Sequence, residues 1–346
     1  MRSVFYPHLV DGPEGDPALY VRLAHRREAL LFDCGALANL QPREMSKIRH
    51  LFISHTHVDH FIDFDRLVRF FLYTDRQLSV YGPVGIADQV SNRLGGYTWN
   101  LVDGYPFEVT VHEWSDEEID TFRFRARNGF RREEIETRRC ADGLLLKTPA
   151  YNVTAVPLAH GSITSLAFTL QEVLHVAIHK NALEQYRYRP GPWLTEFKDL
   201  LRSEKELDAT IAIPLTDGSV IDKAATVLAA EIAHTEPGMK ICYVTDVDPE
   251  ATNLKKIELL AQDAQLLVIE SPFAHIDLER ARQRNHLTAQ LAGEVARRAK
   301  VCRCLFFHFS PRYQQSEINL QDEAQKAFNG KSLSRSAGQQ ASLPRQ

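Results

Sequence analysis

The chain has 346 residues, of which 44% are hydrophobic and 25% charged, as in soluble globular proteins, which excludes a wholly disordered or collagen-like chain. Its 41 basic and 45 acidic residues give a net charge of −4, which excludes binding to nucleic acid through bulk positive charge. No signal-peptide pattern or membrane-spanning run occurs, and the five cysteines are odd in number and contain no CxxC pair, so we expect a cytoplasmic protein.

Short apolar runs closed by turn residues predict strands throughout the first half of the chain. The expected strands are 18–24, 29–33, 50–54, 78–82, 107–113, 121–127, 144–148 and 152–157. A helical pattern over 62–71 follows the third of these runs. The residues between that strand and that helix are therefore expected on a strand-to-helix loop.

The second half repeats the alternation, which predicts two packed sheets with helices outside them. Expected strands are 210–213, 240–245, 266–270 and 303–309, and expected helices are 251–261, 287–299 and 320–328. Residues 171–206 interrupt this pattern with aromatic and basic residues around Arg189-Pro190-Gly191-Pro192, which predicts a protruding arm or a lid. Residues 331–346 are rich in Ser, Gln and Arg, a composition typical of a disordered tail.

The strongest chemical motif lies on the expected strand-to-helix loop. His55, His57, Asp59 and His60 place four potential metal ligands within six residues. Three imidazoles and a carboxylate suit zinc, and also manganese or iron. The alternative interpretation is a histidine-rich surface turn, which the strand–loop–helix setting disfavours.

Three further residues follow apolar runs in the same way. His160 precedes Gly161, Asp246 ends the run that begins at residue 240, and His308 lies in a late strand. Each alone is equally well explained as a buried, hydrogen-bonded polar residue. Their shared place at strand ends favours additional metal ligands, because a buried charge or imidazole is costly without a partner.

The order H-x-H-x-D-H, His-Gly, strand-end Asp and late His resembles the metallo-β-lactamase superfamily. Within it, the second half is similar to the ribonuclease Z family of tRNA 3′-processing endonucleases. Four segments carry this resemblance, namely His308-Phe309-Ser310-Pro311-Arg312-Tyr313, Glu270-Ser271-Pro272-Phe273, His286-Leu287-Thr288-Ala289 and Pro190-Gly191-Pro192-Trp193.

The resemblance implies a fold and a set of roles. The fold would be a four-layer αββα sandwich over residues 1–330, with the arm inserted at about 171–206. One metal would be held by His55, His57 and His160, the other by Asp59, His60 and His308, with Asp246 and a hydroxide bridging them. Asp59, His286 and Glu270 would act in catalysis, with His286 donating a proton to the leaving oxygen and Glu270 orienting its ring. The alternative interpretation is that His286 is a polar residue at the start of a helix and Glu270 a solvated acid at the end of a strand.

The resemblance also implies partners. It predicts a phosphodiester substrate, RNA or a tRNA 3′ trailer, and a homodimer in which one subunit's arm serves the other's site. Candidate substrate contacts are Tyr186, Arg187, Arg189, Trp193, Lys198 and Arg312. The arm residues equally suit a dimer contact or a lid, because aromatic and arginine residues are enriched at protein interfaces.

The chain departs from the family pattern near the substrate rather than near the metals. Residues 36–39 and 58–64 differ from the usual sequence, and the early basic loop has no counterpart. Two alternatives therefore stay open. In one, the same metal site serves another ester class, such as a thioester, lactone or sulfate ester. In the other, the fold is kept as a non-catalytic binding module.

Overall fold

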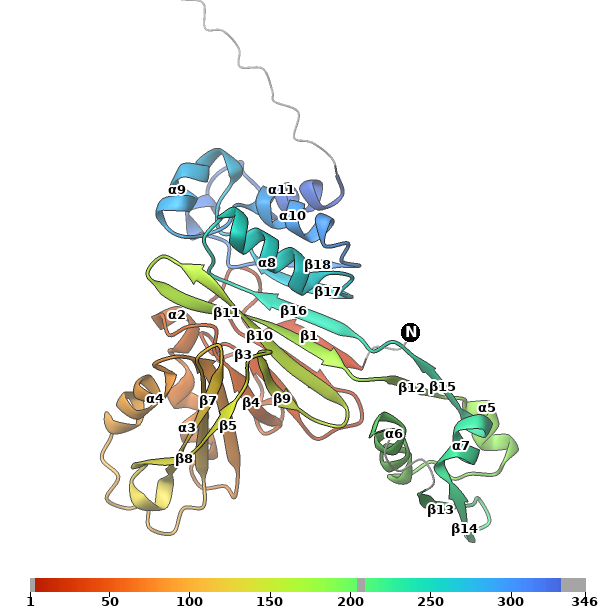
Figure 1. Ribbon diagram of the computed structural model, residues 1–346. Helices are drawn as coiled ribbons and strands as arrows, with labels where there is room; N and C mark the ends of the chain where they lie inside the picture. The colour runs from red at the N-terminus through yellow and green to blue at the C-terminus, as the bar shows by residue number, and fades with distance from the viewer. Residues whose placement is uncertain (1–3, 204–208, 331–346) are drawn as a thin grey trace, which may run out of the picture.

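The computed structural model describes residues 4–203 and 209–330. Two mixed β-sheets pack face to face, and helices cover the outer face of each (Figure 1). The expected four-layer sandwich is confirmed. The tail predicted at 331–346 lies outside the described residues.

The first sheet contains eight strands in chain order, with parallel pairing from β3 to β6 and antiparallel pairing elsewhere. Its strands are β1 (Phe5–Leu9), β2 (Leu19–Leu23), β3 (Ala29–Phe32), β4 (Ile48–Phe52), β5 (Gln77–Pro83), β6 (Glu108–Trp114), β7 (Glu118–Arg125) and β8 (Arg132–Arg139). Its helices are α1 (Pro42–Met45), α2 (Val58–Phe61), α3 (Phe64–Phe71), α4 (Ile86–Gly95) and the 3-10 turn η1 (Ala126–Asn128).

The second sheet has the order β18-β17-β16-β11-β10-β9, with β16, β17 and β18 parallel. Its strands are β9 (Leu144–Lys147), β10 (Tyr151–His160), β11 (Ile163–Glu172), β16 (Lys240–Val244), β17 (Leu266–Glu270) and β18 (Cys304–Phe307). Its helices are α8 (Ala251–Ala261), α9 (Leu278–Gln283), α10 (Ala289–Arg298) and α11 (Leu320–Phe328), with the 3-10 turns η2 (His275–Asp277) and η3 (Pro311–Tyr313).

Three apolar clusters hold these layers together, one in each interlayer space. The first lies between the first sheet and α3 and α4, the second between the two sheets, and the third between the second sheet and α8, α10 and α11. In the middle cluster Phe32, Phe52, Phe168 and Tyr243 from both sheets form a group of aromatic rings. This burial of apolar surface provides the main stabilisation of the sandwich.

A smaller unit protrudes from one end of the sandwich (Figure 1). It contains β12 (His175–Ile178), α5 (Lys180–Gln185), α6 (Trp193–Ser203), β13 (Thr210–Pro214), β14 (Val220–Ala224), α7 (Ala225–Ile232) and β15 (Ala233–Glu236). We call residues 173–238 the arm. Strands β12 and β15 pair with each other, and β13 pairs with β14.

The arm corrects one expectation about the elements. The run at 210–213 was expected among the strands of the packed sheets, but it forms β13 of the arm and faces the arm's own apolar cluster. Alternation of apolar and polar residues identifies a strand, but it does not say which sheet the strand joins.

Candidate metal centre

The candidate site lies where strands of both sheets end. His55 follows β4, Asp246 follows β16, Glu270 ends β17 and His308 follows β18. These four strands run parallel to a neighbour, and the carboxyl ends of parallel strands meet at one edge of a sheet. Residues far apart in sequence are therefore brought to one place.

The motif loop itself is short and sharply turned. His57 has extended backbone angles and precedes the first turn of α2, where the His60 N–H donates to the His57 carbonyl at 3.1 Å. This turn brings His55 and His60 together, with ring centroids 4.2 Å apart. The predicted convergence of the four motif residues depends on this loop.

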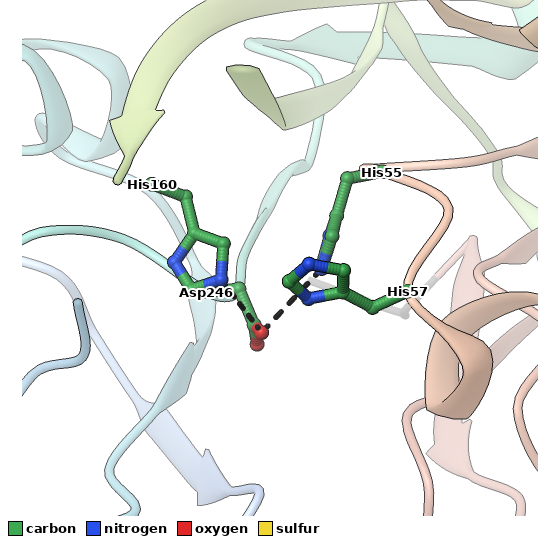
Figure 2. Close-up of side chains that lie close together, drawn as sticks. All are labelled: His55, His57, His160 and Asp246. Carbon is green, nitrogen blue, oxygen red and sulfur yellow. Dashed lines mark ion pairs between the residues drawn. The ribbon is translucent and has the colours of Figure 1, made fainter. Parts of the chain in front are cut away.

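The first cluster consists of His55, His57, His160 and Asp246 (Figure 2). Each offers a ligand atom, and these atoms all lie within 4.8 Å of one another. The Nε2 atoms of His55 and His160 each lie 3.5 Å from Oδ2 of Asp246. These side chains converge from three separate segments of the chain, namely the motif loop, the end of β10 and the residues after β16.

The second cluster consists of Asp59, His60 and His308, again within 4.8 Å of one another. Asp59 Oδ2 lies 3.6 Å from His60 Nε2 and 3.4 Å from His308 Nε2. Oδ1 of Asp246 lies 3.3 Å from His60 Nε2 and 3.1 Å from His308 Nδ1. Asp246 therefore turns one oxygen toward each cluster.

The buried nitrogens at the site fit cation binding. The Nε2 atoms of His55 and His60 and the Nδ1 atom of His308 are buried and have no hydrogen-bond partner. Buried polar atoms in folded proteins nearly always make a hydrogen bond, so three nitrogens that face the carboxylate of Asp246 without one fit the binding of a cation. The clusters are consistent with a dinuclear metal site, since imidazole and carboxylate donors suit divalent transition metals.

The charges at the site agree with this interpretation. Burial lowers the pKa of His55 to about 2, so its ring is neutral at physiological pH and its lone pair is free. Burial also disfavours a charge on His60, but Asp246 and Asp33 outweigh it and raise the pKa of His60 to about 10. The carboxylates therefore create a negative potential that favours a bound cation.

A second layer of hydrogen bonds orients the candidate ligands. Nδ1 of His60 lies 2.9 Å from Asp33 Oδ2, which also accepts hydrogen bonds from Tyr243 Oη and Ser54 Oγ, each at 2.8 Å. Nδ1 of His160 lies 2.8 Å from the Asn285 carbonyl. A proton held on Nδ1 leaves Nε2 free to bind a metal.

Asp33 was not predicted as a functional residue. It follows the apolar strand β3 and is fully buried, which is the same signal that identified Asp246. Asp33, Asp246 and His308 also share left-handed backbone angles, with φ of 56°, 43° and 61°. Non-glycine residues rarely adopt this conformation, and such strain clusters at functional sites.

Glu270 and His286 form a pair beside the two clusters. Nδ1 of His286 lies 2.8 Å from Glu270 Oε2, while Glu270 Oε1 accepts hydrogen bonds from the backbone N–H groups of Val247 and Leu287. Glu270 is fully buried, so it is not a solvated strand-end acid. The His286 ring centroid lies 5.2 Å from that of His160 and 5.7 Å from that of His308.

The candidate substrate contacts lie apart from this site. Tyr186, Arg187 and Arg189 are exposed on the arm, which extends from the end of the sandwich remote from α2 (Figure 1). Lys198 is half-buried on α6, and Arg312 is exposed in the turn after His308. Trp193 corrects the expectation of a stacking face, because it is 6% exposed inside the arm and donates to the Arg189 carbonyl.

No family model matches this chain. A ribonuclease Z from Deinococcus radiodurans is 30% identical over 310 residues, which cover 88% of this chain and 90% of that protein. The chain belongs to the ribonuclease Z family. A ribonuclease Z from Enterococcus faecalis is also 30% identical, over 314 residues that cover 88% of this chain and 85% of that protein.

Solved structures agree with the metallo-β-lactamase fold. The protein YhfI from Bacillus subtilis aligns with a TM-score of 0.51 and 15% identity, covering 93% of this chain and 91% of that one. The short form of human tRNase Z aligns with a TM-score of 0.50 and 18% identity, covering 89% of this chain and 91% of that one. Among residues 4–203 and 209–330 of the present chain, no helix is long and apolar enough to cross a membrane.

Proposed function

We propose that this chain is a metal-dependent phosphodiesterase that cleaves RNA, with a tRNA 3′ trailer as the first substrate to test. Membership of the ribonuclease Z family supports an RNA substrate. The observation that carries the proposal is Asp246, whose two oxygens face two separate groups of nitrogen and carboxylate donors. This is the arrangement expected of a carboxylate shared by two cations.

The proposed ligand sets follow the two clusters. His55, His57 and His160 would hold one divalent ion, and Asp59, His60 and His308 the other, with Asp246 shared. We propose zinc at both positions, with manganese or iron as alternatives. Such a pair supplies Lewis acidity at the phosphate and makes water nucleophilic at neutral pH.

The chain's own residues would handle the leaving group. The Glu270 carboxylate fixes Nδ1 of His286, so the other ring nitrogen is free to donate a proton to the departing oxygen. Burial lowers the pKa of His286, but the carboxylates of Glu270 and Asp246 together raise it, and the net direction is upward. A raised pKa favours the protonated ring that an acid catalyst requires.

The arm would bind the RNA away from the scissile bond. Tyr186 is 38% exposed, and Arg187 and Arg189 beside it are exposed. Aromatic faces next to guanidinium groups suit bases and phosphates. Because the arm points away from α2, we propose that it grips a distant part of the RNA or serves the site of a second subunit.

A second candidate function has one observation in its favour. The β1–β2 turn contains Asp11, Glu14 and Asp16 and no basic residue, and its Pro13 carbonyl accepts a hydrogen bond from Phe309 N, next to His308. Burial raises the pKa of Asp16, and the nearby charge of Asp59 adds to this. An acidic turn beside the site favours a substrate that is less anionic than the RNA polyanion, such as a neutral thioester or lactone or a small sulfate ester with a single charge.

One experiment tests both candidates. Purified protein loaded with zinc or manganese is offered a pre-tRNA with a 3′ trailer, bis(p-nitrophenyl) phosphate and ester substrates of the three other classes. We expect phosphodiester cleavage that Asp246→Asn abolishes and that Asp322→Asn, an exposed position on α11, leaves intact. Turnover of esters alone would support the second function, and no turnover of any substrate would contradict both.

A further inference from the structure

The arm has an apolar core of its own. Its cluster contains Trp193, Phe197, Leu201 and Leu228 and is separate from the three clusters of the sandwich. Domains that share no large apolar interface move relative to each other unless something else holds them. The direction of the arm must therefore be set at the neck, where the chain leaves and re-enters the sandwich.

Glu172 lies at the centre of this neck. It ends β11, immediately before the arm, and is 1% exposed. Its Oε2 accepts a hydrogen bond at 3.2 Å from Met239 N, on the segment that returns from the arm between β15 and β16. Gly238 allows the close approach, because a Cβ there would lie 2.0 Å from the Glu172 carbonyl oxygen. The Glu172 side chain thus connects the segment that leaves the sandwich with the segment that returns to it.

The same carboxylate binds two side chains of the arm. His175 Nδ1 lies 3.2 Å from Glu172 Oε2, and Arg202 Nη2 donates to Glu172 Oε1 at 3.3 Å. Arg202, on α6, also donates through Nε to the Leu174 carbonyl at 3.0 Å. A buried carboxylate is costly unless it is paired and hydrogen-bonded, so these contacts favour a single geometry.

A second ion pair carries the connection to the first sheet. Asp199, on α6, accepts hydrogen bonds from Arg202 Nη1 at 3.0 Å and from Arg26 Nη2 at 2.7 Å. Arg26 lies in the turn between β2 and β3 of the sandwich. The chain Arg26–Asp199–Arg202–Glu172 therefore links α6 to both sheets, and we call it the neck network.

We propose that the neck network fixes the direction of the arm, so that Arg26, Asp199, Arg202 and Glu172 are positioning residues for a substrate that spans the arm and the metal centre. The expected effect on substrate cleavage rests on the proposed function, whereas the direction of the arm does not depend on it. A small ester that reaches only the metals needs no arm, whereas a structured RNA does. Misplacement of a substrate by about 1 Å can cost roughly a hundredfold in rate.

The first test measures arm direction without any substrate. Spin labels are attached at Val220→Cys on the arm and Ile276→Cys on the sandwich, both highly exposed, in a Cys302→Ser/Cys304→Ser background. Dilution with unlabelled protein removes distances between subunits. We expect one narrow distance distribution in the parent, which Arg26→Met and Arg202→Met broaden or shift, and which Arg26→Lys preserves.

Two charge-matched variants serve as controls. Lys223→Met breaks the Lys223–Glu231 pair inside the arm, and Arg298→Met breaks the Arg298–Glu258 pair on the helices of the second sheet. Both should leave the distribution unchanged. Arg26 is partly exposed and forms an ion pair with Asp199, so Arg26→Met decides the question even if Arg202→Met does not fold. Distributions in Arg26→Met that match the parent would overturn the proposal.

The second test measures the consequence for substrates. Arg26→Met should lower kcat/KM for structured RNA by about tenfold to a hundredfold while leaving bis(p-nitrophenyl) phosphate unchanged. A shifted arm with unchanged RNA cleavage would overturn the positioning role. If the parent cleaves no RNA, the proposed function fails, and the label distances still decide whether the neck network holds the arm.

Discussion

Three imidazoles at the metal centre have their second ring nitrogen held by another group. Asp33 binds Nδ1 of His60, the Asn285 carbonyl binds Nδ1 of His160, and Ser54 Oγ lies 3.1 Å from Nδ1 of His55. Each contact fixes the orientation of the ring and leaves Nε2 facing the cluster. The precision of the site therefore depends on residues that are not themselves ligands.

A substitution of Asp33 tests whether the groups that orient the rings affect metal binding. Asp33→Asn should weaken metal binding at the Asp59, His60 and His308 cluster by about tenfold to a hundredfold, because His60 loses its charged partner. Competition titration with a chelating dye measures this. The cluster around His160 should keep its affinity. Asp65→Asn, which disturbs only the surface contacts of Arg93 and Tyr97, is the control, and equal affinities in both variants would contradict the role of Asp33.

The proposed acid role of His286 has its own signature. His286→Ala should lower the rate of RNA cleavage by about a hundredfold or more, because the leaving ribose oxygen needs a proton. Cleavage of bis(p-nitrophenyl) phosphate should fall much less, since p-nitrophenolate leaves without one. Metal content is checked in the same samples. An equal loss on both substrates would show that His286 supports the site in another way.

Patterns in the sequence could predict the candidate metal ligands better than the groups that orient their rings. His55, His57, Asp59 and His60 form a compact motif, and Asp246 and His308 follow apolar runs. The contact between His160 and the carbonyl of Asn285 involves a backbone atom, which no side-chain pattern marks. The burial of Trp193 could not be predicted either, because aromatic residues suit a core and a binding surface equally.

At the scale of elements, two strands of the first sheet carry half-buried histidines that lie outside the candidate metal site. Burial lowers the pKa of His50, on β4, to about 4, and burial with the nearby Arg138 does the same for His112, on β6. Both rings flank Tyr81, with centroids 6.0 and 4.5 Å away. They are therefore neutral in the folded protein at pH 7.

The pH dependence of stability follows from these two groups. In the unfolded chain their pKa is 6.5, so the unfolded state binds more protons between pH 6.5 and 4. Stability is full above this window and falls as the pH drops through it. In metal-free protein, His50→Gln/His112→Gln should reduce the loss between pH 7 and 5 by about 2 kcal/mol for each histidine.

Urea unfolding at the two pH values measures this effect. His234→Gln, at an exposed position on β15, should leave the pH dependence as in the parent. If the double variant loses as much stability on acidification as the parent, these two rings are not held neutral in the folded protein.

The sequence could predict most elements because apolar periodicity is local. The motif strand and helix, the β9–β10 pair and helices α8, α10 and α11 lie where the patterns place them. The assignment of 210–213 failed because strand pairing depends on contacts distant in sequence. The neck network could not be predicted for the same reason, since Arg26 and Asp199 are 173 positions apart.

At the scale of the whole molecule, we propose that the sandwich carries the reaction and that the arm binds RNA. Glu172 N donates to the Met239 carbonyl at 2.8 Å, so the two ends of the arm are adjacent. Replacing residues 174–237 with a short glycine linker should leave the sandwich folded. If the arm binds RNA as proposed, the arm-less protein should cleave RNA about tenfold or more slowly, while its turnover of bis(p-nitrophenyl) phosphate, which is too small to contact the arm, is kept. Equal RNA cleavage with and without the arm would contradict an RNA-binding role.

The account as a whole depends on two cations sharing Asp246. Anomalous diffraction at the zinc or manganese edge, from crystals grown with that metal, tests this directly. The account predicts two peaks per chain, one among His55, His57 and His160 and one among Asp59, His60 and His308, with Asp246 between them. A single peak, or peaks away from these residues, would contradict it.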